Sequence, residues 1–147
     1  MNMKKGVTFI MLLCLCLLCA CDDNNTDTTT TSPESSTAAG YQKIIAKEAK
    51  DLMDSGEPYI LLDVRTDEEY AEERIDGAIL IPDYEISDRA AAELPDKSAL
   101  ILIYCRSGRR SEIAANELLG MVYTNVYDFG GIIDWPYDTV SGDLNGS

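Results

Sequence analysis

The most informative stretch of the chain is residues 99–110, which read ALILIYCRSGRR. Its first part, residues 99–104, carries no charge and no alternation of polar with apolar positions. Such a run is typical of a strand that is buried on both faces, as in a parallel sheet. The run continues into a cysteine and then into glycine and three arginines. The stretch therefore predicts a buried parallel strand that ends in a positively charged loop.

Shorter apolar runs alternate with helical patterns on both sides of this strand. A polar segment begins with Thr66, three residues before Glu69, which is the spacing of a capping box at a helix start. Further strands are expected at 59–64, 78–81 and 125–128, and amphipathic helices at 45–53, 86–94 and 111–119. Alternation of strands with helices predicts an α/β fold with a mainly parallel sheet.

The composition excludes several classes of function. The chain has 147 residues, which fits one domain with a leader attached. It has no histidine, which excludes imidazole bases, Ser-His-Asp and Cys-His pairs, and His-ligated zinc. The formal net charge of −14 argues against a nucleic-acid partner, because such a partner requires a basic surface. No cofactor and no metal ion are expected.

The first twenty residues have the proportions of a secretory signal peptide. Two lysines, Lys4 and Lys5, precede the uncharged, mostly apolar residues 6–20. This run is shorter than the roughly 20 apolar residues that span a bilayer, and a buried helix or short anchor is the alternative. Residues 18–21, LCAC, resemble the lipobox of bacterial lipoproteins, in which Cys21 would be lipidated and become the mature N-terminus. Ordinary cleavage would instead leave Cys21 as a free thiol.

Residues 21–40 are expected to be the lipidated cysteine and a disordered linker. They are rich in Thr, Ser and Asp, contain no Lys or Arg, and cannot bury an apolar face. The expected location is the extracytoplasmic face of a bacterial membrane, reached through lipid on Cys21. Asp22 resembles a retention signal of enteric Gram-negative lipoproteins and would have no such meaning in a Gram-positive cell. With the leader removed and Cys21 lipidated, Cys105 is the sole thiol, so no internal disulfide can form.

The predicted chemistry is concentrated where the 99–104 strand ends. Sites in open parallel sheets form at the carboxyl ends of strands. The following helix N-terminus supplies free N–H groups and partial positive charge, and these favour a thiolate when guanidinium groups are also near. The same groups would bind an anion. Cys105 is therefore the candidate nucleophile, although a cysteine after a buried strand is often only a core residue.

Several motifs together resemble the rhodanese family over most of residues 41–136. The segment 105–111, CRSGRRS, is close to the active loop of that family. The other matching segments are LLDVR at 61–65 with Glu69-Tyr70, RIDGA at 74–78 with Ile81-Pro82, and residues 125–135, which hold Asn125-Val126, Gly130-Gly131-Ile132 and Trp135. Arg74 stands where the family usually has His, a difference that we expect to affect structure rather than catalysis. The resemblance implies a three-layer domain with helices on both sides of the central sheet.

The same resemblance implies a sulfurtransferase in which Cys105 accepts sulfur. Cys105 would attack thiosulfate or a similar small anionic donor, become a persulfide and pass the sulfur to cyanide, a thiol or a protein acceptor. Side chains of the loop would hold the donor, and its backbone N–H groups would cradle the persulfide. The implied donor site consists of Arg106, Ser107, Gly108, Arg109, Arg110 and Ser111.

Residues outside the loop are assigned structural roles. Asp63 and Arg65 are expected to support the site by pairing with each other or with Glu69. Residues 137–147 carry no motif and are expected to form a C-terminal tail after the rhodanese-like domain at 41–136.

Two other functions are compatible with the same loop. The domain would be a lipid-anchored persulfide carrier or sensor if it turned over little substrate by itself. It would be a Cys-based phosphatase or arsenate reductase if the loop bound a phosphoryl-like oxyanion. The phosphatase loop has the pattern Cys-x5-Arg, one residue longer, whereas position six after Cys105 is Ser111 here. The shorter loop favours the persulfide.

Overall fold

The computed structural model describes residues 40–142, which form a single five-stranded sheet with four α-helices. The strands are β1 (Gln42–Lys43), β2 (Tyr59–Asp63), β3 (Ile79–Leu80), β4 (Leu100–Cys105) and β5 (Val126–Gly131). The helices are α1 (Ala46–Asp54), α2 (Asp67–Glu72), α3 (Ile86–Glu93) and α4 (Arg109–Gly120), with short 3-10 turns η1 (Asp83–Glu85) and η2 (Ile132–Asp134). The strand order is β1-β5-β4-β2-β3, and all four neighbouring pairs are parallel.

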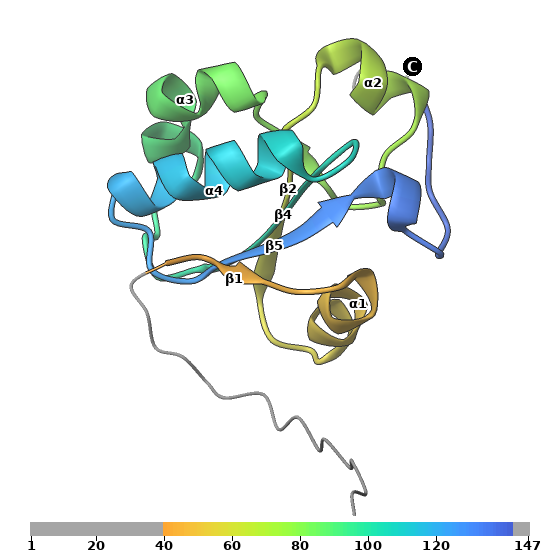
Figure 1. Ribbon diagram of the computed structural model, residues 1–147, viewed down its shortest axis with the longest axis horizontal. Helices are drawn as coiled ribbons and strands as arrows, with labels where there is room; N and C mark the ends of the chain where they lie inside the picture. The colour runs from red at the N-terminus through yellow and green to blue at the C-terminus, as the bar shows by residue number, and fades with distance from the viewer. Residues whose placement is uncertain (1–39, 143–147) are drawn as a thin grey trace, which may run out of the picture. The chain divides into compact units, whose positions relative to one another are not determined.

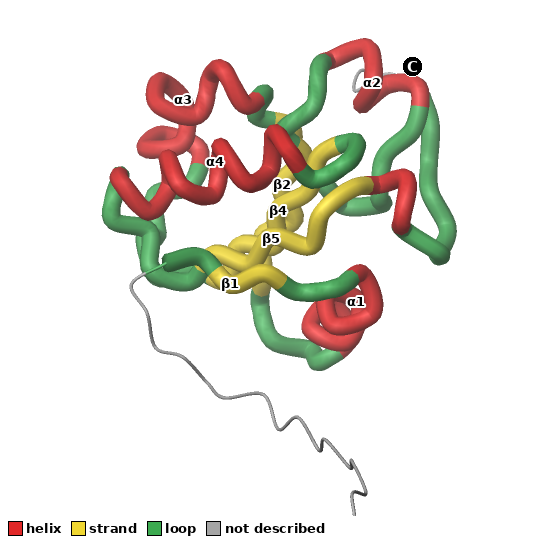
Figure 2. Tube along the Cα trace, viewed as in Figure 1, coloured by secondary structure: helices red, strands yellow, loops and turns green. Residues whose placement is uncertain are grey.

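Helices cover both faces of the sheet. Helices α3 and α4 lie on one face and α1 lies on the other (Figure 1). Figure 2 shows the strands as a separate layer between these helices. The predicted α/β fold, with a parallel sheet in the middle of three layers, is confirmed.

The central strand β4 is buried on both faces, as its apolar run predicted. Ile103 and Cys105 belong to the core that packs against α3 and α4. Leu102 and Tyr104 belong to the core that packs against α1. Side chains alternate between the faces of a strand, so this one run supplies both cores and its last residue faces α4.

The main differences from the sequence-based expectation are the start of one helix, the end of one strand and one additional strand. Helix α4 begins at Arg109, two residues before the predicted start, because Gly108 takes the N-cap position. Strand β5 runs on to Gly131, beyond the predicted end at residue 128. Strand β1 was not predicted, since its two exposed residues, Gln42 and Lys43, carry no apolar pattern and pair only with β5.

The segment that follows η2 is tied back to the domain. Arg74 and Val140 exchange backbone hydrogen bonds of 2.8 Å each, and the Arg74 guanidinium donates to the carbonyl of Gly142 at 2.7 Å. Arg74 therefore fixes residues that were expected to form a tail. The predicted signal peptide and Cys21 lie outside the described residues. Within residues 40–142, no helix is long and apolar enough to cross a membrane.

Candidate active site

Cys105 is the last residue of β4 and is almost fully buried, with 1% of its surface exposed. Its Sγ accepts a hydrogen bond from the backbone N–H of Gly108 at 3.0 Å. The loop therefore folds back over the sulfur instead of leading away from it. A backbone donor aimed at sulfur stabilises the anionic form of that sulfur more than the neutral form.

Gly108 sets the shape of this loop. Its φ of 97° lies in the left-handed region, which glycine adopts without steric cost. Gly108 is also the N-cap of α4, where no side chain caps the helix. The first N–H groups of this helix are consequently left to a ligand, and they carry the partial positive charge of the helix N-terminus.

Strand β5 forms a floor beneath the loop. A Cβ atom on Gly131 would lie 2.6 Å from the Cα of Ser107 and even closer to the carbonyl oxygen of Arg106. Real Cβ atoms do not approach backbone atoms so closely, so only glycine fits at this position. The sequence displays the Gly130-Gly131 pair, but it does not show that the loop rests on it.

Ser111 fastens the loop to this floor. Its hydroxyl is directed at the carbonyl oxygens of Gly108, at 3.0 Å, and of Gly130, at 3.3 Å, and the residue is fully buried. The hydroxyl is thus used within the protein, and what remains for a ligand is the backbone N–H. Of the residues assigned to the donor site, Ser111 therefore stabilises the loop through its hydroxyl, and this hydroxyl is not free to bind a donor.

The three arginines of the loop are not equivalent. Arg106 and Arg109 are exposed, and neither side chain is paired with another residue of the described range. Arg110 instead makes two hydrogen bonds to the Glu69 carboxylate, at 2.7 and 2.8 Å. These hydrogen bonds from Arg110 hold the pKa of Glu69 at about 2. The guanidinium groups available to an anion are those of Arg106 and Arg109.

Asp63 and Arg65 form a buried ion pair beside the loop. The Arg65 Nη2 lies 2.6 Å from the Asp63 Oδ2, and both side chains are at most 4% exposed. Arg65 also donates to the carbonyl of Glu73 at 2.5 Å. Of the two partners that the sequence left open for Arg65, the structure selects Asp63. Glu69 pairs with Arg110, an ion pair that joins α2 to the start of α4.

A cavity of about 250 Å³ opens beside Arg106, between α2 and η2. It is lined by the charged residues Arg65, Glu69, Glu72, Glu73 and Arg106 and by the apolar residues Ile132 and Ile133. Arg106 therefore borders a space that it shares with a second arginine and three glutamates. No cluster of three or more metal-ligating side chains is present within residues 40–142.

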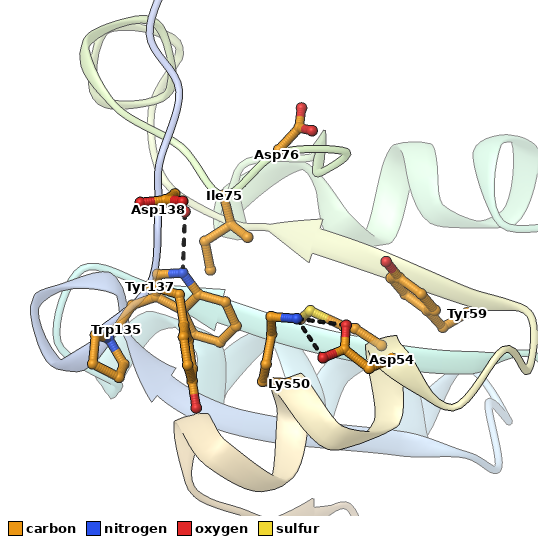
Figure 3. Close-up of a pocket in the computed structure, with 10 residues that line it drawn as sticks. Lys50, Asp54, Tyr59, Ile75, Asp76, Trp135, Tyr137 and Asp138 are labelled. Carbon is orange, nitrogen blue, oxygen red and sulfur yellow. Dashed lines mark hydrogen bonds and ion pairs between the residues drawn. The ribbon is translucent and has the colours of Figure 1, made fainter.

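Figure 3 shows a larger hollow, of about 450 Å³, whose lining does not include Cys105. Its walls are α1, the first residue of β2, Ile75 and Asp76 after α2, and the segment after η2, with the aromatic rings of Tyr59, Trp135 and Tyr137. Lys50 lies in this hollow and is paired with Asp54. No residue of the 105–111 loop lines it, so it is separate from the thiol chemistry.

Comparisons with known proteins agree with this geometry. The family model described as "Rhodanese-like domain" matches residues 45–136. The thiosulfate sulfurtransferase PspE of Escherichia coli K12 is 41% identical over 81 residues, which are 55% of this chain and 78% of that protein. A sulfurtransferase of Allochromatium vinosum is 40% identical over 80 residues, 54% of this chain and 73% of that protein. A solved structure described as rhodanese with anions from E. coli is 39% identical, with a TM-score of 0.55, and covers 58% of this chain and 100% of its own.

Proposed function

The chain belongs to the rhodanese family, and we propose that it is a sulfurtransferase that carries sulfur on Cys105 as a persulfide. One observation carries the proposal: the Gly108 N–H donates to the Cys105 Sγ inside a loop that closes at an uncapped helix N-terminus. This arrangement favours a thiolate before reaction and an anionic persulfide after it. No general base is required, which agrees with a chain that has no histidine.

The first half-reaction is attack by the Cys105 thiolate on the outer sulfur of thiosulfate. A new S–S bond forms, the S–S bond of thiosulfate breaks, and sulfite leaves with the bonding electron pair. Arg106 and Arg109 are placed to hold the sulfonate part of the donor, because their guanidinium groups are exposed and unpaired among the described residues. Arg110 acts indirectly, since it is held by Glu69.

The second half-reaction passes the outer sulfur to an acceptor. A cyanide ion or thiolate attacks the terminal sulfur of the persulfide and takes it as thiocyanate or as a new persulfide, and the Cys105 thiolate leaves. Cys105 is the only cysteine among residues 40–142, so no second thiol of the described domain can receive the sulfur. The acceptor comes from outside this domain, which also supports a second candidate function as a persulfide carrier for a protein partner.

The proposal is tested by intact mass of the full chain before and after incubation with thiosulfate. We expect a gain of one sulfur that cyanide removes, and no such gain in Cys105→Ala, which controls for the cysteines of the leader. An unchanged mass in the native chain would overturn the persulfide. A persulfide that forms but turns over negligibly with cyanide or small thiols would favour the carrier.

The leader adds a location to the proposal. Lipid on Cys21 would hold the domain at the extracytoplasmic face of a bacterial membrane, with residues 22–40 as the tether. The support is the lipobox-like sequence LCAC at residues 18–21. Mass spectrometry of the mature N-terminus is the test: a diacylated Cys21 in the native chain, and an unlipidated product in Cys21→Ser, are the expected results. A mature N-terminus elsewhere would refute the anchor.

A further inference from the structure

Asp128 in β5 is a buried carboxylate that the proposed chemistry does not use. Its side chain is 0% exposed, and Oδ2 has no hydrogen-bond partner within the described residues. The ammonium of Lys43 lies 3.9 Å from Oδ2, but Lys43 is 59% exposed and also lies 3.6 Å from Glu112. Burying an incompletely paired carboxylate is unfavourable for folding. The other oxygen, Oδ1, makes a hydrogen bond within β5 that indicates the role of Asp128.

Oδ1 of Asp128 accepts a hydrogen bond from the backbone N–H of Gly130 at 2.9 Å. The ladder between β4 and β5 is irregular at this point: Ile103 is opposite Asp128, whereas Cys105 is opposite Gly131. Strand β5 thus holds one residue more than β4 between these pairs, which is a β-bulge. A bulge leaves backbone groups without partners in the ladder, and the Asp128 carboxylate satisfies one of them.

A short series of contacts leads from this bulge to the sulfur. The carbonyl of Gly130 accepts from the Ser111 hydroxyl, which is shared with the carbonyl of Gly108. A Cβ on Gly108 would lie 3.5 Å from the Cα of Gly130, so the backbone of Gly130 borders the space beside Gly108. The N–H of Gly108 is the group that donates to the Cys105 Sγ. Hydrogen bonds thus connect Asp128 to Gly130, Gly130 to Ser111, Ser111 to Gly108, and Gly108 to the sulfur.

We propose that Asp128 is a positioning residue of the active loop: its carboxylate holds the Gly130 bulge in place, and the bulge aims the Gly108 N–H at the Cys105 sulfur. The effect on catalysis rests on the proposed function. The direction of the Gly108 N–H towards the Cys105 sulfur does not rest on that function, because its effect can be measured on the thiol without sulfur transfer.

The test compares two substitutions that differ in one property. Asp128→Asn keeps an oxygen that accepts from Gly130. Asp128→Val keeps the bulk of a strand residue and removes the acceptor, together with the unpaired Oδ2, so the fold is expected to survive. Glu112→Gln is the matched control, since it removes a nearby negative charge without touching the bulge.

Two properties of the full chain are measured for each variant. One is kcat/KM for sulfur transfer from thiosulfate to cyanide. The other is the rate at which iodoacetamide alkylates Cys105, followed over pH by mass spectrometry of the peptide that contains Cys105. The second readout reports stabilisation of the thiolate, which a purely structural role of Asp128 would not change.

For Asp128→Val we expect kcat/KM to fall about tenfold and the pH of half-maximal alkylation to rise by about one unit, the same free-energy change in both readouts. Asp128→Asn and Glu112→Gln are expected to stay within about twofold of the native chain. A folded Asp128→Val with native values would overturn the proposal. So would an Asp128→Asn that loses as much as Asp128→Val, because the charge and not the acceptor would then be responsible.

If Asp128→Val does not fold, Ser111→Ala decides the matter, because it removes the next contact of the series and leaves Asp128 in place. A rise in the alkylation midpoint supports the proposal, and an unchanged midpoint overturns it. A native chain that forms no persulfide refutes the proposed function alone, since the alkylation profile still measures the positioning of the sulfur.

Discussion

Strands β2 and β4 are neighbours in the sheet, and each is followed by a loop and a helix, yet the two loops are built in opposite ways. After β2, the side chain of Thr66 caps α2 and accepts from the N–H of Glu69, while the Glu69 carboxylate accepts from the N–H of Thr66. After β4, Gly108 caps α4 and offers no side chain. The N-terminus of α2 is therefore satisfied within the protein, and that of α4 is left to a ligand.

The charges in the two loops follow the same division. The one charged side chain between β2 and α2, Arg65, is neutralised because it is buried against Asp63. The charges of Arg106 and Arg109 after β4 are exposed. Only the third arginine, Arg110, is neutralised, and its partner is Glu69 from the helix after β2. The β2 loop is thus a structural support, and the β4 loop keeps the exposed guanidinium groups that the proposed anion binding requires.

The largest expected effect is on the stability of the fold and concerns the ion pair between Asp63 and Arg65 after β2. Arg65→Met leaves the Asp63 carboxylate buried without its partner, and such changes cost about 3–5 kcal/mol of unfolding free energy. We expect urea denaturation to show a loss of this size, while the folded fraction keeps its native specific activity. The double variant Asp63→Asn with Arg65→Met should recover most of the loss. A folded Arg65→Met with little specific activity would instead place Arg65 in the chemistry.

The next effect concerns the floor of the β4 loop. In Gly131→Ala the new methyl group would meet the backbone of Arg106 and Ser107, so the loop must shift. A shift of about 1 Å in an active loop lowers rates by about a hundredfold. We expect such a fall in kcat/KM for thiosulfate, and Gly120→Ala is the control because its φ, like that of Gly131, lies outside the left-handed region and its Cβ meets nothing within 4 Å. Equal losses in both variants would point to a general effect of the added methyl group and away from the contact between Gly131 and the loop.

A smaller effect, on KM, is expected if the N-terminus of α4 is given a capping side chain like the one at the N-terminus of α2. Gly108→Asn places an amide oxygen next to the free N–H groups of α4, where it competes with the donor anion, and asparagine tolerates the left-handed φ. We expect KM for thiosulfate to rise about tenfold, by the loss of about one charge-assisted hydrogen bond. Gly108→Ala adds the strain without the oxygen. Competition at the N-terminus is refuted if Ala raises KM as much as Asn.

The sequence predicted those features that depend on neighbouring residues. The buried runs gave β2 and β4, because burial on both faces leaves a local apolar pattern. The capping box at Thr66 was predictable because its partners are three residues apart. The pair between Glu69 and Arg110 was not, since 41 residues separate them and either could have remained exposed. The contact of Gly131 with the loop was missed for the same reason, because it arises only when β5 is placed beside β4.

The smallest effect concerns the ion pair between Glu69 and Arg110, which links the helix after β2 to the helix after β4. The pKa of Glu69 is about 2 in the folded chain, below its ordinary value of 4.5, because Arg110 donates hydrogen bonds to it. A depressed folded pKa gives stability that is present above pH 4.5 and is lost as pH falls towards 2. Since the pair is partly exposed, we expect Glu69→Gln to lower the unfolding free energy by about 1–2 kcal/mol at pH 7.

Denaturant titrations of the native chain and of Glu69→Gln, at pH 7 and near pH 2, should therefore give curves that differ at the higher pH and converge at the lower. Glu72→Gln is the control, because this exposed carboxylate of the same helix forms no ion pair with the described residues and its removal should have little effect at either pH. A difference that persisted near pH 2 would mean that Glu69 stabilises the fold through its packing. The charge of Arg110 would then be free to join Arg106 and Arg109 in holding the anion, and the separation between the supporting loop and the binding loop would be weaker than the ion pair implies.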